Sequence, residues 1–369
     1  MDLRQTPEAA EDHARFAGER ARLLMALGAL TEGGVLEAAE HVGATSMAGL
    51  VGRPSLDIAL AVWPFPLEEP ARAALANLGY TLDPAFAGEP EQRFLDASGD
   101  TRLYVVASGS SQWTDYRLVR EHLRHDAAAR ETYSVHKREW SVGGSETDYE
   151  EAKRRWLDRL VEEARRSWIE REGFDPARRV VDELRELPIG WRIAGGWALD
   201  LFLRRVTRVH HDVDIVVSRA DQLHLRAYLT GRGWKLVTPY EQRFSSWPEH
   251  MRLEAPRFQV HAHRDGAFMD FMLTDMEGGV WRYRREPSIV RDLSQMELRT
   301  DEGIPFLAPE LALLFKSKTS DGQTREKDVA DFEGIYPRLE PERRAWLLWA
   351  LTAYAPDHPW IARLRDVQK

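Results

Sequence analysis

The chain has 369 residues, which is long enough for two domains with separate cores. It is 43% hydrophobic and 30% charged, as expected for a globular protein, and its formal charge of −9 argues against non-specific nucleic-acid binding. It contains no cysteine, which excludes disulfides, zinc–thiolate sites and thiol nucleophiles. We find no apolar run near the roughly 18 residues of a membrane span, and the N-terminus is polar, so we expect a cytoplasmic protein with no membrane partner.

The first half of the chain alternates helical and extended patterns. We predict a helix over residues 6–28, a strand over 35–42, and a turn, short helix and strand between 43 and 62. Two further strands, 93–97 and 102–107, flank a hairpin signal at Ser98-Gly99-Asp100. From about residue 113 to residue 171 the pattern is helical, with Arg and Glu three and four residues apart.

Several motifs of this half stand in a fixed order. They are His41-Val42-Gly43-x-Thr45-Ser46, Gly49-Leu50, Arg53-Pro54, Asp57-Ile58, and the later run from Asp115 to Arg124 with the helix around Tyr149–Lys153. In these residues the first half resembles the GrpB-like family, a relative of the nucleotidyltransferase fold. The resemblance covers most of residues 20–165 and implies no defined activity.

A turn-rich break at 172–176 predicts a linker, so we expect domains at 1–171 and 172–369. The second half begins with a predicted helix over 177–187. After residue 217 we predict a helix over 220–230, a strand from residue 235, and strands over 258–263 and 268–273. From residue 308 to the end the pattern is helical.

The stretch from Ile193 to Val217 carries the strongest chemical signal. It reads as a strand end, the Gly195-Gly196 turn, a helix over 197–204 and a second strand with two aspartates. Asp212 and Asp214 are two residues apart, so on one strand their carboxylates share a face. Two carboxylates beside a glycine turn that opens a helix are suited to a divalent cation next to a phosphate.

The ordered set Gly195-Gly196-Trp197, Thr207-Arg208, His210 and Asp212-Val213-Asp214 resembles the aminoglycoside and lincosamide nucleotidyltransferases, which belong to the polymerase β-like nucleotidyltransferase superfamily. With the GrpB-like half, the resemblance implies an α+β protein with two nucleotidyltransferase-fold domains in tandem. Each would be a small mixed sheet with flanking helices, followed in the second domain by C-terminal helices.

We assign the third carboxylate to Asp270, which stands in the apolar run Ala267-Phe268-Met269-Asp270-Phe271-Met272. Burying an aspartate without a partner costs free energy, so this position favours a role as a cation ligand or as a base. Asp265 and Asp275 are competitors at the strand ends. The resemblance implies that Asp212, Asp214 and Asp270 are catalytic and bind Mg²⁺, with Asp270 either a ligand or the general base. It implies nucleotide contacts by Gly195, Gly196, Arg208, His210 and Lys316.

The two halves have the same predicted order of elements: a strand, a glycine turn, a helix and a strand that carries an aspartate. We match Asp57 to Asp212, which leaves Ala59 at the position of Asp214 and places the missing third carboxylate near Leu103-Tyr104-Val105. One carboxylate alone is a poor magnesium site. We therefore interpret the first half as a degenerate domain kept for support, dimerisation or ligand sensing, with a purely structural domain as the alternative.

The leading hypothesis is a Mg²⁺-dependent transfer of a nucleoside monophosphate, AMP from ATP, to a hydroxyl of a small, aminoglycoside-like molecule. The alternatives are a protein or tRNA acceptor, which the acidic charge disfavours for tRNA, and a nucleotide-binding sensor without turnover. Polar and aromatic residues between positions 234 and 281 are candidates to frame the acceptor: Tyr240, Glu241, Trp247, Glu249 and Trp281. The sequence leaves open whether the protein forms a homo-oligomer.

Overall fold

The computed structural model describes residues 4–5, 10–28, 30, 36–52, 54–88, 90–140, 146–240, 243–264, 267–320 and 323–366. Of the residues singled out in the sequence, positions 6–9 and 35, Arg53, Glu241 and Asp265 lie outside these ranges. By its internal contacts the chain divides into two units. The N-terminal unit comprises residues 1–171 with 239–246, and the C-terminal unit comprises 172–238 with 247–369.

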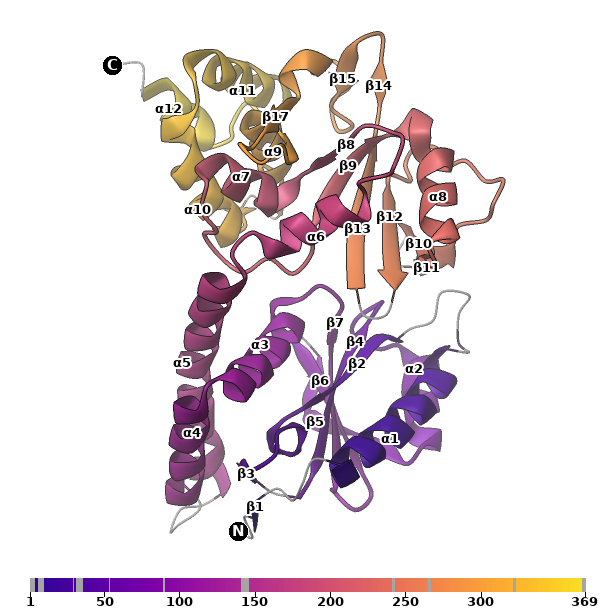
Figure 1. Ribbon diagram of the computed structural model, residues 1–369, viewed down its shortest axis with the longest axis vertical. Helices are drawn as coiled ribbons and strands as arrows, with labels where there is room; N and C mark the ends of the chain where they lie inside the picture. Colours follow the sequence, from indigo (N-terminus) through magenta and orange to yellow (C-terminus); the bar gives the residue numbers. More distant parts are fainter. Residues whose placement is uncertain are drawn as a thin grey trace. The chain divides into compact units, whose positions relative to one another are not determined.

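The N-terminal unit contains a five-stranded mixed sheet (Figure 1). Its order is β2 (Leu36–Val42), β4 (Leu56–Val62), β7 (Thr101–Ala107), β6 (Glu91–Asp96) and β5 (Tyr80–Gly88). β4 and β7 are parallel, and the other neighbours are antiparallel. The sequence reading missed β5 and the helix before it, α2 (Glu69–Asn77). A separate pair, β1 (Arg4–Gln5) with β3 (Val51–Gly52), is antiparallel.

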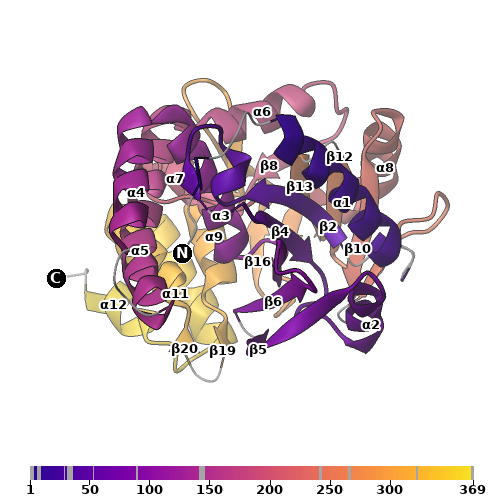
Figure 2. The same cartoon turned by 90° about the horizontal axis from the view of Figure 1, so that it is seen from below.

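Alternation along β4 gives its sheet two different faces. Leu56, Ile58 and Leu60 pack in the core formed with α1 (Ala10–Gly28) and α2. The residues in between, Ala59 and Ala61, pack with Trp113 of α3 (Ser111–His125) on the opposite face. Figure 2 shows α1 and α2 together and α3 across the strands from them. By the same alternation, Asp57 belongs to the α3 face.

Two long helices follow α3 in the N-terminal unit, namely α4 (Ala127–Trp140) and α5 (Glu146–Glu172). They share a small core with α3 and with the turn after β2, in which Leu123, Tyr133 and Leu160 meet Met47 and Leu50. The η1 turn (Ala44–Ser46) is part of that segment. The helical pattern predicted from residue 113 to residue 171 is thus three helices, the last of which continues to Glu172.

The C-terminal unit contains most of an eight-stranded mixed sheet. From β10 onward its order is β10 (Lys235–Tyr240), β12 (Gln259–Arg264), β13 (Ala267–Thr274), β9 (Asp214–Ser218), β8 (Trp191–Ile193), β18 (Pro305–Leu307) and β17 (Glu297–Arg299). The remaining strand, β11 (Arg243–Ser246), falls within residues 239–246. β18 runs parallel to β8. The two strands β17 and β18 were not predicted, because each has only three residues.

Helices and short strands complete the C-terminal unit. They are α6 (Asp175–Glu183), α7 (Gly195–Leu203), η2 (Arg219–Asp221), α8 (Gln222–Gly231), η3 (Leu293–Gln295), α9 (Pro309–Lys316), α10 (Glu326–Ile335), η4 (Tyr336–Arg338), α11 (Pro341–Tyr354) and α12 (Trp360–Asp366), with strands β14 (Met276–Glu277), β15 (Val280–Arg282), β16 (Val290–Asp292), β19 (Thr319–Ser320) and β20 (Gln323–Thr324). Proline stands at one of the first two positions of α6, α9 and α11, where its missing N–H costs no helical hydrogen bond.

The two sheets share one topology. Reading β2-β4-β7-β6-β5 beside β8-β9-β13-β12-β10 gives the same chain order and the same sequence of antiparallel, parallel, antiparallel and antiparallel pairings. In both units a helix, α2 or α8, precedes the outer strand of this set. The expectation that the halves share a topology is confirmed.

The residue correspondence that we drew from the sequence is wrong. In β4 the cross-strand partner of Asp57 is Val42, the residue before Gly43. In β9 the backbone of Asp214 pairs with Ala194, the residue before Gly195. Asp57 therefore corresponds to Asp214, not to Asp212, because pairing register rather than motif spacing decides which side chains meet.

The corrected register changes which ligands the N-terminal unit lacks. The parallel partner of Asp214 is Asp270, and the parallel partner of Asp57 is Arg102. The third carboxylate position is thus occupied by an arginine, one residue before the segment 103–105 where we expected it. Two residues before Asp57 stands Ser55, at the position of Asp212. Ala59 is a core residue, not a lost ligand.

Candidate active site

Three carboxylates gather at two central strands of the C-terminal sheet, β9 and β13. Asp214 is the first residue of β9 and Asp270 lies beside it on β13, as predicted. Asp212 precedes the strand instead of lying on it. Each of the three residues has a carboxylate oxygen within 4.8 Å of the others. One cation with metal–oxygen distances of about 2.0–2.6 Å can bridge such a set.

Trp197 holds the backbone at the first of these aspartates. Its indole Nε1–H donates to the carbonyl oxygen of Asp212 at 3.0 Å, and its ring is fully buried. Asp212 therefore reaches the site from a loop that is fixed by a buried side chain of α7, although it is not part of the ladder. The sequence motif placed Trp197 near the turn, and the hydrogen bond now gives its role.

The backbone of the glycine turn at the start of α7 lies very close to side chains of the site. Gly195 has φ 60°, and a Cβ added there would lie 1.8 Å from Oδ2 of Asp214. At Gly196 a Cβ would lie 2.4 Å from the ring of His210 and 2.6 Å from Nη2 of Arg208. Any other residue would therefore displace the side chains of the site. The two glycines let the N-terminus of α7, with its partial positive charge, lie against the carboxylates.

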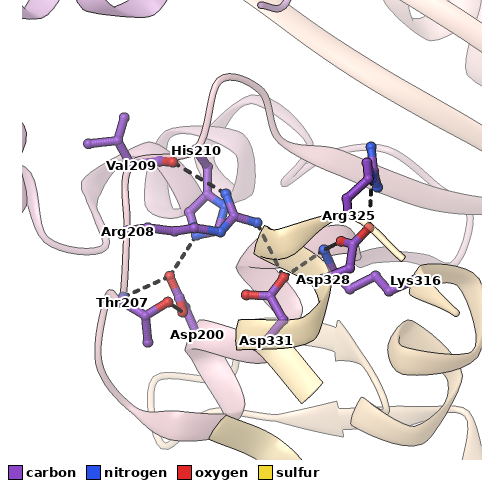
Figure 3. Close-up of polar contacts among 9 residues, drawn as sticks. All are labelled: Asp200, Thr207, Arg208, Val209, His210, Lys316, Arg325, Asp328 and Asp331. Atoms are coloured by element: carbon purple, nitrogen blue, oxygen red, sulfur yellow. Dashed lines mark hydrogen bonds and ion pairs between the residues drawn. The ribbon is translucent and has the colours of Figure 1, made fainter. Parts of the chain in front are cut away.

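A buried hydrogen-bond cluster fixes the loop between α7 and β9. Asp200, 1% exposed, accepts from the backbone N–H of Thr207 at 3.1 Å and from its hydroxyl at 2.6 Å. It also lies 2.6 Å from Nε2 of His210 (Figure 3). Because a carboxylate accepts, Nε2 is the donor here. Burial lowers the pKa of His210 and Asp200 opposes that shift, which leaves a neutral, oriented ring.

The lysine that we assigned to the nucleotide is held by two aspartates. Lys316 Nζ lies 3.0 Å from Asp328 Oδ1 and 2.7 Å from Asp331 Oδ2. Asp331 also pairs with Arg208 at 3.4 Å (Figure 3). Burial works to raise the pKa of Asp331, but Lys316 and Arg208 outweigh it and the net shift is downward. Lys316 and Arg208 are thus joined through one carboxylate.

Lys327 is the exposed cation beside the carboxylates. It lies on α10, one residue before Asp328, and its charge acts on both Asp212 and Asp214. Burial and the neighbouring cations, Arg325 first among them, lower its pKa. Lys327 is exposed, whereas Lys316 is 8% exposed and pairs with Asp328 and Asp331.

The carboxylates are in an environment that favours a bound cation. Burial raises the pKa of Asp212 and of Asp214, and the charge of Asp212 raises that of Asp214 further. Two buried like charges at this separation cost free energy until a proton or a cation neutralises them. The donor set is all oxygen, which is the set that Mg²⁺ prefers. The three residues therefore fit the magnesium ion that the sequence resemblance implies.

Asp270 has neighbours on β12 that the sequence did not reveal. Gln259 Nε2 donates to Asp270 Oδ2 at 2.5 Å, and His261 Nε2 lies 3.8 Å from Oδ1. His261 is the cross-strand partner of Asp270. Burial lowers the pKa of His261 to about 3, so the ring is neutral at pH 7. Only the antiparallel register of β12 and β13 brings these residues together, which leaves no local sequence signal.

Other residues of the sequence reading have structural roles. Asp275 pairs with Arg219 at 2.7 Å, so it does not compete for the carboxylate site. Trp281 is fully buried and donates to Thr274, and Trp247, 4% exposed, donates to the carbonyl of Met251. The two tryptophans are core residues, and the expectation that they frame an acceptor is wrong. Glu249 is exposed.

The N-terminal unit repeats the close approach of glycine and aspartate. Gly43 has φ 71°, and a Cβ there would lie 2.2 Å from Oδ2 of Asp57. The hydroxyls of Thr45 and Ser46 donate to the carbonyls of Ser55 and Gly43, at 3.0 and 2.7 Å. They therefore brace the turn and do not face an anion. Each glycine–aspartate contact belongs to the same structural position of the fold.

The shared topology, the glycine turns and the carboxylate set define tandem nucleotidyltransferase-fold domains. Two family models match the chain: that of the GrpB protein over residues 6–163, and that of aminoglycoside-2''-adenylyltransferase over residues 177–335. Residues 6–163 are therefore similar to GrpB, and residues 177–335 are similar to aminoglycoside-2''-adenylyltransferase. Among curated proteins, a UPF0157 protein of Streptomyces coelicolor is 36% identical over 124 residues, which are 33% of this chain and 62% of that protein's length.

Solved structures of low identity resemble one unit or the other. GrpB from Enterococcus faecalis is 18% identical and covers 44% of this chain and 96% of its own, with a TM-score of 0.38. ANT(2'')-Ia in complex with adenylyl-2''-tobramycin is 15% identical and covers 49% and 97%, with a TM-score of 0.34. A lincosamide antibiotic adenylyltransferase with lincomycin bound is 18% identical and covers 43% and 94%, with a TM-score of 0.32.

Among the residues that the structure describes, no helix is both long enough and apolar enough to cross a bilayer.

Proposed function

We propose that the C-terminal unit transfers a nucleoside monophosphate, AMP from ATP, to a hydroxyl of a small, aminoglycoside-like molecule, with Mg²⁺ as cofactor. The observation that carries the proposal is the set of three carboxylates within 4.8 Å beside the Gly195-Gly196 turn. The match of residues 177–335 to the aminoglycoside-2''-adenylyltransferase family supports the choice of AMP and of the acceptor class.

Asp212 and Asp214 would hold the magnesium ion, with Asp270 as a third ligand or as the base. When bound, the ion neutralises charge on the triphosphate. The acceptor oxygen forms a bond to the α-phosphorus, the bond to the bridging oxygen breaks, pyrophosphate leaves, and the hydroxyl proton passes to a base. Asp270 would accept that proton, and Gln259 donates a hydrogen bond that fixes one of its oxygens. Such fixing reduces the reorganisation needed during the reaction.

The remaining polar residues would bind and orient the triphosphate. Gly195 and Gly196 let the backbone N–H groups at the start of α7 approach the phosphates. Lys327, exposed beside Asp212 and Asp214, is placed to meet the leaving pyrophosphate. Lys316 and Arg208 share Asp331, so they would add positive potential from a fixed position. His210 is held by Asp200 and would keep the glycine turn in place.

A screen of the full chain tests this proposal. Thermal shift would be measured with each of the four nucleoside triphosphates, with and without Mg²⁺, and pyrophosphate release would be followed with a panel of aminoglycosides and lincosamides. We expect ATP with Mg²⁺ to give the largest stabilisation, and one class of acceptor to gain the mass of AMP. If Mg²⁺–ATP bound but no acceptor and no water supported pyrophosphate release, the protein would be a nucleotide sensor.

A further inference from the structure

Arg208 lies beside the first turn of α7 and is held there by two long hydrogen bonds. Its Nη2 is 2.6 Å from the place that a Cβ on Gly196 would take. It donates to the carbonyl of Val209 at 3.3 Å and to Oδ2 of Asp331 at 3.4 Å, whereas N–H···O distances are usually about 2.7–3.2 Å. Its Nε is buried and has no hydrogen-bond partner among the described residues. The guanidinium therefore has donors to offer to another acceptor.

Asp331 has a second and closer partner. The same oxygen, Oδ2, lies 2.7 Å from Nζ of Lys316, and the Asp331 side chain is 8% exposed (Figure 3). Lys316 also contacts Asp328 at 3.0 Å, and Asp328 pairs with Arg325 at 2.6 Å. The network thus joins three cations to two carboxylates. If Arg208 left it, Asp331 would keep Lys316 and Asp328 would keep Arg325.

This charge balance makes the contact between Arg208 and Asp331 easy to exchange. A buried carboxylate without a cation is costly, and that cost would normally keep an arginine in place. Lys316 removes it, because Asp331 stays neutralised by the closer cation. A triphosphate offers charged oxygens, and a guanidinium can bind two of them in one plane. Arg208 already lies against the turn at Gly196, so a small rotation of its guanidinium is sufficient.

We propose that Arg208 exchanges Asp331 for the triphosphate when the nucleotide binds, and that Lys316 is the positioning residue that stays on Asp331 and makes this exchange possible. The inference rests on the proposed nucleotide transfer. It gives Lys316 a role that acts through a carboxylate, whereas the sequence resemblance implied a direct contact of Lys316 with the nucleotide. Asp331 holds the guanidinium beside α7 until the nucleotide arrives.

The test measures the Kd of Mg²⁺–ATP for the full chain by isothermal titration calorimetry, without an acceptor. Lys316→Met removes the cation that stays on Asp331, so Asp331 retains Arg208 more strongly. Because the nucleotide must compete with this pair, its Kd should rise about tenfold. Adding Asp331→Asn to Lys316→Met removes the carboxylate that retains Arg208, so the Kd should return to within about twofold of the original.

Asp328→Asn in the Lys316→Met background is the matched control. It restores the same net charge, but the ion pairs of Asp328 in the described chain are with Lys316 and Arg325. Arg208 would still be retained, so the Kd should remain raised about tenfold. Equal recovery with both aspartate substitutions would show that only net charge matters. Recovery with neither would indicate a direct contact of Lys316 with the triphosphate, and either result overturns the proposal.

Asp331→Asn alone tests the exchange even if Lys316→Met fails to fold, which thermal unfolding would show. It frees Arg208 from its carboxylate, so the Kd of Mg²⁺–ATP should fall about threefold to fivefold. In an Arg208→Gln background the same substitution should change the Kd by less than about 1.5-fold, because the residue that it frees is missing. Equal effects in the two backgrounds would overturn the proposal.

Binding by the unsubstituted chain distinguishes a failure of the exchange from a failure of the proposed function. If that chain bound no nucleoside triphosphate with Mg²⁺, the proposed function would fail and the exchange with it. If it bound Mg²⁺–ATP but the variants showed no selective recovery, the exchange alone would be overturned and the proposed function would stand.

Discussion

The two units share a strand order and a glycine–aspartate contact, but one carboxylate position of the C-terminal unit is an arginine in the N-terminal unit. Asp214 has two carboxylate neighbours, whereas the partner of Asp57 in the parallel ladder is Arg102. The topology survives this exchange because other residues of the same strands, Ile58 and Leu60 in β4 and Ile215 and Val217 in β9, are buried in the cores. The comparison shows that the buried core and the carboxylate set depend on different residues of the same strands.

The largest effect on turnover is expected from the loss of one carboxylate of the proposed cation site. Asp212→Asn or Asp214→Asn keeps the side-chain shape but removes a charge from the proposed cation site. We expect turnover to fall by about 100-fold or more, since metal charge stabilisation is worth several kcal/mol. The turnover rate is measured as the rate of pyrophosphate release at saturating concentrations of Mg²⁺–ATP and acceptor.

The matched control for that prediction is Asp57→Asn in the N-terminal unit. It removes the equivalent carboxylate, beside Gly43 instead of Gly195. The rate should remain within about twofold of the original, because this unit lacks the partner carboxylates. If Asp57→Asn abolished turnover and Asp214→Asn preserved it, the assignment of the active site would be reversed.

Asp270→Asn tests the carboxylate whose position is taken by Arg102 in the N-terminal unit. We expect turnover to fall by about 10-fold to 100-fold. The Mg²⁺ concentration for half-maximal rate should rise as well, since Asp270 lies within 4.8 Å of the other two carboxylates. An unchanged Mg²⁺ dependence with slow chemistry would instead assign Asp270 as the general base only.

The glycine substitutions are expected to act equally on stability and unequally on activity. Gly195→Ala and Gly43→Ala each place a Cβ within 2.2 Å of an aspartate oxygen on a backbone with positive φ. We expect each to destabilise its own unit by about 1–3 kcal/mol, measured by denaturant unfolding. Gly195→Ala should also lower the rate of the folded protein, whereas an equal rate loss in Gly43→Ala would show that the N-terminal turn takes part in turnover.

The smallest expected effect is a pH dependence of the free energy of unfolding of the N-terminal unit. His41 is 3% exposed, lies 3.0 Å from the Thr45 hydroxyl, and has its pKa lowered to about 4, first by burial and then by nearby cations. A histidine with a folded pKa below its unfolded 6.5 favours the folded state above pH 6.5, and that stability is lost as pH falls toward 4.

Between pH 7 and pH 5 we expect the free energy of unfolding to fall by about 1–2 kcal/mol through this group. His41→Gln, which cannot take up the proton, should flatten this part of the pH profile even if its stability at pH 7 is lower. Denaturant titrations at both pH values measure the difference. An unchanged pH slope in His41→Gln would assign the acid sensitivity to other groups.

The sequence alone was sufficient for several features of this protein. The period-two runs and turn residues marked β4, β6, β7, β9, β12 and β13, and the ordered glycine and aspartate motifs pointed to Asp212, Asp214 and Asp270. These signals are local: alternation, turn chemistry and a buried carboxylate are all visible within a few residues. The shared topology of the two halves followed from the same signals in the same order.

Tertiary structure decided the rest, because it depends on pairs far apart in the chain. Strand register matched Asp57 with Asp214 and put Arg102 in the place of a carboxylate, which motif spacing had assigned differently. Helix packing tied Lys316 to Asp328 and Asp331 and left Lys327 exposed. A one-residue change of register moves every side chain to the other face of a sheet, so no local pattern could fix which charges meet.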